Sequence, residues 1–150
     1  MLVDRVYGAQ LYLSGNWDRT VSSIEWLPDS RGLLSAIDDA ATNRLYRFDL
    51  SGRAPRPVTA SSSYSGLAIA ARGGANPTAV ALRQNFSDPA TLVRVDLRTG
   101  DFTRLSTFND ATLATLKLGK VESVTYQGAN NADIQMWVIY PPDFDPAKKY

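Results

Sequence analysis

The chain has 150 residues, 44% of them hydrophobic, and 16 basic against 15 acidic side chains give a formal net charge of +1. This composition is typical of a globular protein with a sizeable core, and the balanced charge argues against a nucleic-acid-binding surface. No run approaches the roughly 18 apolar residues of a membrane span, and the first residues lack the order of a signal peptide, so no membrane partner is predicted.

A 47-residue repeat organises most of the chain. LYRFDL at 45–50 aligns with LVRVDL at 92–97, and PVT at 57–59 aligns with RLS at 104–106. Both alignments use the same offset, which is close to the length of a four-stranded β-propeller blade. The repeat therefore predicts an all-β fold, a partial β-propeller of about two four-stranded blades plus part of a preceding one.

The blades divide the chain in order. Residues 1–20 are predicted to end a preceding blade, with strands inside 5–13, and two blades follow at 21–63 and 64–108. The first blade has predicted strands at 21–27, 33–37, 44–50 and 56–59. The second has them at 66–71, 78–84, 91–97 and 102–106. Turns rich in Pro, Asp and Gly, at 28–32 and 73–77, separate the first two strands of each blade.

The character of the sequence changes after the repeat. Residues 109–120 are predicted to be a linker, with a short helix at 110–117 that Asn109 or Asp110 caps and Gly119 ends. All twelve arginines precede residue 117 and all four lysines lie at or after it. Residues 121–150 then read as the first strands of a second domain, cut off before the domain is built.

The sequence contains neither histidine nor cysteine. This removes the usual general base, the partner that activates a serine nucleophile, the commonest metal ligand and every thiolate site. We therefore expect no catalytic, cofactor-binding or metal-binding residue in this chain, and no cofactor. A cysteine-free chain is indifferent to redox poise, so the compartment, cytoplasmic or bacterial periplasmic, stays open.

Several polar motifs have a functional and a structural interpretation. The adjacent pair Asp38 and Asp39 is able to bind calcium or share a proton, but residues 38–43 lie between two predicted strands and lack EF-hand spacing, so a solvated turn at 38–43 is preferred. Trp17, Asp18 and Arg19 are able to face a channel or a partner. Packing of Trp17 between blades, with the two charged residues at the polar ends of its loop, is preferred.

The remaining candidates are weaker. Glu25 and Glu122 are the only glutamates, and a site built from both would have to cross the predicted boundary, which we do not expect. Without a Gly-x-Ser-x-Gly elbow or a histidine, the serines are predicted to be linker between blades. These are Ser61, Ser62, Ser63 and Ser65. The glycine pair Gly73 and Gly74 lacks the following helix of a phosphate loop.

Five segments together resemble a known family: NWDR at 16–19, WLPDSRG at 26–32, LVRVDL at 92–97 with TG at 99–100, LSTFND at 105–110, and the ending at 134–150. In this order they resemble the prolyl oligopeptidase family of serine peptidases, especially its acylaminoacyl-peptidase and bacterial dipeptidyl-aminopeptidase-like members. The resemblance implies a propeller that covers an α/β-hydrolase domain and admits substrates by size. Residues 121–150 would then be the first strands of that α/β-hydrolase domain.

The resemblance places the Ser-Asp-His triad and the oxyanion loop after residue 150, so none of the family's catalytic residues is carried over and the chain alone is expected to be inactive. Its implied role is that of substrate gate and scaffold in a peptidase that hydrolyses short peptides. Implied partners are those peptides, the rest of the parent chain with its hydrolase domain, and a second copy through exposed strand edges. The alternatives are a TolB-like propeller module for protein–protein binding and, much less favoured, a metal-dependent propeller hydrolase or lactonase.

Overall fold

The computed structural model describes residues 1–15, 17–21, 23–70 and 77–150 and divides into two compact units, Met1–Ser106 and Thr107–Tyr150. Most of the predicted turn at 73–77, one residue each of the predicted strands at 21–27 and 66–71, and the first residue of the NWDR motif lie outside the described residues. Within these ranges, no helix is long and apolar enough to cross a membrane.

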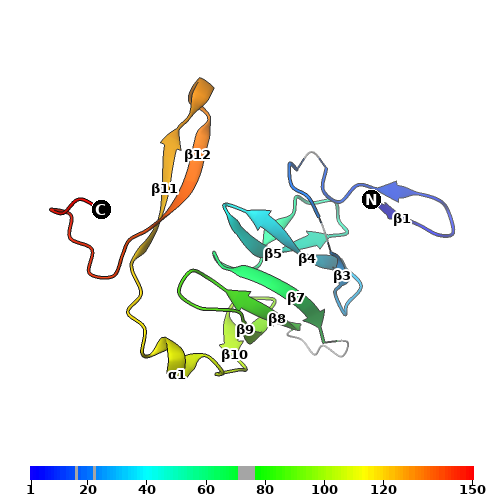
Figure 1. The fold of residues 1–150 in the computed structure, drawn as a ribbon. Helices are drawn as coiled ribbons and strands as arrows, with labels where there is room; N and C mark the ends of the chain where they lie inside the picture. Colours follow the sequence, from blue (N-terminus) through cyan, green and yellow to red (C-terminus); the bar gives the residue numbers. More distant parts are fainter. Residues whose placement is uncertain (16, 22, 71–76) are drawn as a thin grey trace. The chain divides into compact units, whose positions relative to one another are not determined.

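Two four-stranded antiparallel sheets make up most of the first unit (Figure 1). The first sheet has the order β3 (Glu25–Trp26), β4 (Gly32–Asp39), β5 (Thr42–Asp49), β6 (Arg56–Pro57). The second has the order β10 (Phe102–Arg104), β9 (Thr91–Asp96), β8 (Thr78–Gln84), β7 (Ser63–Ile69). A short hairpin of β1 (Leu2–Val3) and β2 (Gln10–Leu11) precedes them. Each sheet is a meander of four consecutive strands, as the all-β prediction requires.

The 47-residue repeat recurs in the backbone hydrogen bonds. Val58 N donates to Leu45 O at 2.7 Å, and Leu105 N donates to Leu92 O at 2.8 Å. Side chains repeat the pattern, because the hydroxyl of Thr59 accepts from Leu45 N at 3.1 Å and that of Ser106 accepts from Leu92 N at 3.0 Å. In each sheet a hydroxyl thus satisfies a backbone N–H at the point where the short outer strand ends.

The first sheet is buried on both faces. Leu34, Ala36 and Leu45 pack with Tyr64, Ala79, Ala81, Val93 and Val95 of the second sheet in one core. On the opposite face, Leu33, Ile37, Tyr46 and Phe48 form a second core with Leu13, against which Trp17 and Val21 pack. Burial on both faces explains the imperfect alternation of polar and apolar residues along β5.

Strand β7 (Ser63–Ile69) begins earlier than the predicted strand at 66–71 and includes two of the serines that were predicted to be linker. Ser63 and Ser65 do not belong to a linker but to β7, where they pair with Gln84 and Leu82. The ladder to β8 is interrupted between Ser65 and Ala68, where Gly66 has a φ of +58°. The hydrogen-bonding strand β8 and the burial of Tyr64 outweigh the weak strand preference of these small polar residues.

The second unit begins with a short helix and continues as a hairpin. Helix α1 (Asp110–Leu113) is shorter than predicted, and its N-cap residue Asn109 makes no side-chain capping bond. Gly119 does not end the helix; a Cβ there would collide with Tyr140 O, so close backbone approach explains this glycine. Strands β11 (Val121–Gln127) and β12 (Asp133–Ile139) pair antiparallel, joined through the short 3₁₀ helix η1 (Ala129–Asn131).

We predict that Gly100→Ala destabilises the chain by at least about 2 kcal/mol, because an L residue at this φ of +81° is strained and its Cβ would collide with Val58 O. The matched control is Gly52→Ala, which has a φ of +74° but open space around it and should cost only about 1 kcal/mol. Urea denaturation measures both values. Equal losses would show that Gly100 is needed for its φ alone.

We also predict that Ala40→Asn with Ala41→Gly stabilises the chain by about 1 kcal/mol or more. These two residues form the loop between β4 and β5, and their φ values of +48° and +55° are those of a type I′ turn, which favours Asn-Gly. Ala54→Gly, at an exposed position outside the strands, serves as control and should lower stability slightly. A loss of stability in the double variant would contradict this account of the turn.

Candidate functional site

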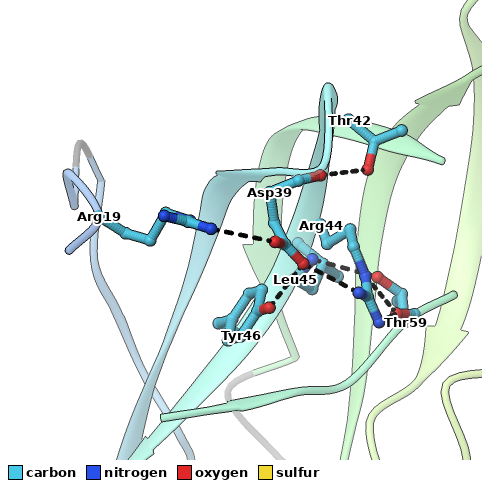
Figure 2. A network of polar contacts seen from close by, with 7 residues as sticks. All are labelled: Arg19, Asp39, Thr42, Arg44, Leu45, Tyr46 and Thr59. Atoms are coloured by element: carbon cyan, nitrogen blue, oxygen red, sulfur yellow. Dashed lines mark hydrogen bonds and ion pairs between the residues drawn. The ribbon is translucent and has the colours of Figure 1, made fainter. Parts of the chain in front are cut away.

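A polar network surrounds the carboxylate of Asp39 at the end of the β4–β5 hairpin (Figure 2). We define the Asp39 network as Arg19, Asp39, Arg44, Tyr46 and Thr59. Asp39 ends β4, while Arg44 and Tyr46 lie on β5 directly across the two-residue loop. Arg19 precedes β3 in the chain and Thr59 follows β6, so the network joins the hairpin to the segments on both sides of its sheet.

One carboxylate oxygen receives two hydrogen bonds. Asp39 Oδ2 accepts from Arg44 Nη1 at 2.9 Å and from the Tyr46 hydroxyl at 2.7 Å. The other oxygen, Oδ1, lies 3.6 Å from Arg19 Nη2. The Arg44 guanidinium also donates from Nε and Nη2 to Thr59 O, at 3.0 and 2.9 Å. Arg44 therefore bridges the hairpin and the connection that follows β6.

The electrostatics hold the network in one protonation state. The hydrogen bond from Tyr46, supported by Arg44 and Arg19, lowers the pKa of Asp39 below its ordinary value of 3.8, although burial opposes this. Burial, followed by the carboxylate of Asp39, raises the pKa of Tyr46 above 10.0. Near neutral pH the carboxylate is ionised and the phenol keeps its proton.

This arrangement positions the backbone and does not favour proton transfer. A general base needs a pKa near the working pH, whereas the carboxylate of Asp39 is a weaker base than usual and both of its oxygens are engaged. The Asp39 side chain is 17% exposed and that of Arg44 is 23% exposed, so solvent screens the pair only in part. The network thus fixes one end of the blade.

The candidate residues from the sequence separate in the structure. Asp38 is exposed and accepts from Asn43 Nδ2 at 2.9 Å, while Asp39 lies inside the network, so the acidic pair does not act as a unit. Both residues belong to the end of β4, and the turn itself is only Ala40 and Ala41, a correction to the predicted turn at 38–43. Within the described part of the chain, no three acidic side chains gather as metal ligands would.

Trp17 packs on the first sheet, 4.9 Å from the Tyr46 ring and 5.8 Å from the Phe48 ring between centroids. Arg19 closes its loop in part as predicted: it donates to the backbone O of Asp18, but its ion pair is with Asp39.

The two glutamates belong to separate units. Glu25 lies on β3, and Glu122 lies on β11, where its carboxylate accepts from the Tyr140 hydroxyl at 2.7 Å and from Lys120. Gly73 and Gly74 lie outside the described residues. No motif in the sequence marks Arg44, Tyr46 and Thr59 as candidate site residues. A signal for Thr59 was present, because a hydroxyl recurs 47 residues later at Ser106.

Known proteins resemble this chain over nearly its whole length. No family model matches it. The chain is 27% identical to dipeptidyl-peptidase 5 of Porphyromonas gingivalis, over 99% of this chain and 21% of that protein. It is 29% identical to a probable dipeptidyl-peptidase 5 of Aspergillus clavatus, over 92% of this chain and 19% of that protein. The chain spans about a fifth of the length of these curated relatives.

Solved structures share the fold. An AtxE2 isopeptidase variant with Astexin3-dC4 bound matches 97% of this chain and 22% of its own, with a TM-score of 0.69 and 17% identity. An acylaminoacyl peptidase in complex with Z-Gly-Gly-Phe-chloromethyl ketone matches 89% of this chain and 19% of its own, with a TM-score of 0.65 and 16% identity. These neighbours confirm the predicted partial β-propeller.

We predict that Asp39→Asn lowers the free energy of unfolding by about 2 kcal/mol at neutral pH, because it weakens charge-assisted hydrogen bonds in a largely buried network. The matched control is Asp38→Asn, which changes an exposed neighbour and should cost under about 0.5 kcal/mol. Urea denaturation of both variants gives the comparison, and equal costs would refute the assigned role of the network.

We predict a pH dependence of stability from the same network, at acid pH through Asp39 and at alkaline pH through Tyr46. Because the pKa of Asp39 is lowered, its contribution is present above pH 3.8 and is lost as the pH falls further, so the deficit of Asp39→Asn shrinks in acid. Because the pKa of Tyr46 is raised, its contribution is present below pH 10.0 and is lost at higher pH. Tyr46→Phe should therefore show a smaller alkaline loss than the parent chain.

Proposed function

We propose a role for this chain as part of a peptidase of the prolyl oligopeptidase family, a proposal that its dipeptidyl-peptidase 5 relatives and the fold of its structural neighbours support. In our proposal the longer protein hydrolyses short peptides. This chain supplies the non-catalytic propeller blades and the junction to the hydrolase domain, acting as substrate gate and scaffold. The observation that carries the proposal is the similarity to dipeptidyl-peptidase 5 along 99% of the chain.

The chemistry of the residues supports a non-catalytic role. The sequence has no histidine, and the carboxylate of Asp39 is held ionised by a tyrosine and two arginines. A rigid hairpin end is what a gate requires, because a filter that admits substrates by size must keep its dimensions. A TolB-like binding module would also use such blades, but it leaves the similarity of residues 121–150 to peptidases without a reason.

Two apolar surfaces support a larger assembly. On the outer face of the second sheet Val80, Leu82 and Leu92 are 36%, 39% and 38% exposed. We propose that the next blade of the longer protein covers this face, as the second sheet covers the first. By the same argument, the hairpin of β11 and β12 would pack into the hydrolase domain, since Tyr126, Ile134 and Met136 share one exposed face.

Expression of the longer protein tests the proposal. We expect it to cleave dipeptidyl or acylaminoacyl chromogenic substrates, and we expect residues 1–150 alone to give no turnover. The reading frame after residue 150 should encode the oxyanion loop, a Gly-x-Ser-x-Gly elbow, and then the aspartate and histidine. Lack of peptidase activity in the longer protein, with those motifs missing, would refute the proposal.

The gate is tested by substrate size. In the longer protein, Asp39→Asn should loosen the hairpin end and raise cleavage of a thirty-residue peptide relative to a dipeptidyl substrate, while Asp38→Asn should leave that ratio unchanged. A ratio that stays constant in both variants would argue against a gate at this end of the blade.

A further inference from the structure

A second polar cluster lies at the opposite end of the first sheet. A pocket of about 460 Å³ is lined by Arg31, from the turn before β4, and by Arg47, Asp49 and Arg53, from the end of β5 and the turn after it. Leu50 N donates to Arg31 O at 3.1 Å, which fixes the two turns side by side. The pocket is therefore built on a hydrogen-bonded frame.

Positive charge exceeds negative charge in this pocket. Arg47 Nε lies 2.6 Å from Asp49 Oδ1, and Arg56 Nε lies 3.8 Å from Asp49 Oδ2, so one carboxylate is shared by two arginines. Asp29, beside Arg31, accepts from the backbone N of Arg31 at 2.9 Å. Among the described residues, the exposed guanidinium groups of Arg31 and Arg53 have no ion-pair partner.

The second sheet shows that this frame does not need the Arg31 side chain. There, Leu97 N donates to Pro77 O at 2.9 Å, as Leu50 N does to Arg31 O, so a proline holds the place of Arg31. Gly100 lies 47 residues after Arg53, but the two turns differ, because Gly100 N donates to Asp96 O whereas Gly52 N donates to Asp49 O. The bond that joins the two turns thus forms without a charge at the position of Arg31.

We propose that this pocket binds a carboxylate group of an acidic peptide. Guanidinium groups form paired hydrogen bonds with carboxylates, and two unpaired ones beside a shared Asp49 leave a net positive site for an anion. The choice of a peptide as the source of the carboxylate rests on the proposed peptidase function. The pocket then favours substrates or product peptides that carry glutamate or aspartate.

Calorimetric titration of the chain tests this inference without any turnover, so its outcome is independent of the hydrolysis assay. The probes are an acetylated and amidated five-residue peptide with two glutamates, its counterpart with two glutamines, and inorganic phosphate. We expect the glutamate peptide to bind about tenfold more tightly than the glutamine peptide. Equal affinities, or phosphate binding as tight as the glutamate peptide, would overturn the assignment.

Variants locate the site. Arg31→Gln with Arg53→Gln should weaken binding of the glutamate peptide by about tenfold or more. The control, Arg5→Gln with Arg98→Gln, removes the same net charge from exposed positions outside the pocket and should change the affinity by less than about twofold. An equal loss in both double variants would mean that only overall charge attracts the peptide, which would refute a built site. Unchanged urea denaturation shows that each variant is folded.

Discussion

Burial of one face of each four-stranded sheet against the other is the interaction on which the rest of the structure depends. Leu34 and Leu45 of the first sheet and Val93 and Val95 of the second are fully buried in this shared core. Each fully buried side chain of this kind contributes roughly 1.5 to 3 kcal/mol, so the core as a whole far exceeds any single polar contact described above. The polar clusters at the two ends of the first sheet are positioned because this stack is rigid.

The sequence predicted the repeat well and the local exceptions poorly. The offset of 47 residues located β5 and β9, since both strands end on the aspartates Asp49 and Asp96. The repeat is visible in these strands because apolar residues recur in them at regular positions, where they face the core. The start of β7 with its serines was missed, because small polar residues form a strand only when a neighbouring strand and a buried Tyr64 hold them there.

The two polar clusters could not be predicted from the sequence, and the reason is different. Arg44 meets Thr59 only because β5 pairs with β6, and Arg31 and Arg53 line one pocket only because two turns from separate hairpins lie side by side. Spacing along the chain carries no sign of either meeting. Gly119 gave a misleading signal, since a glycine after a helix usually ends it, whereas here it allows close approach of Tyr140.

The repeated hydroxyl, Thr59 in one sheet and Ser106 in the other, has a consequence for how such chains diverge. Each hydroxyl accepts a hydrogen bond from a backbone N–H of its own sheet. The hydrogen bonds between the strands therefore do not depend on the loops that connect them. The loop between β4 and β5 has two residues and that between β8 and β9 has six, yet both ladders are intact. Since lengthening a surface loop costs little closure entropy, loop length is free to drift in evolution while the blade keeps its frame.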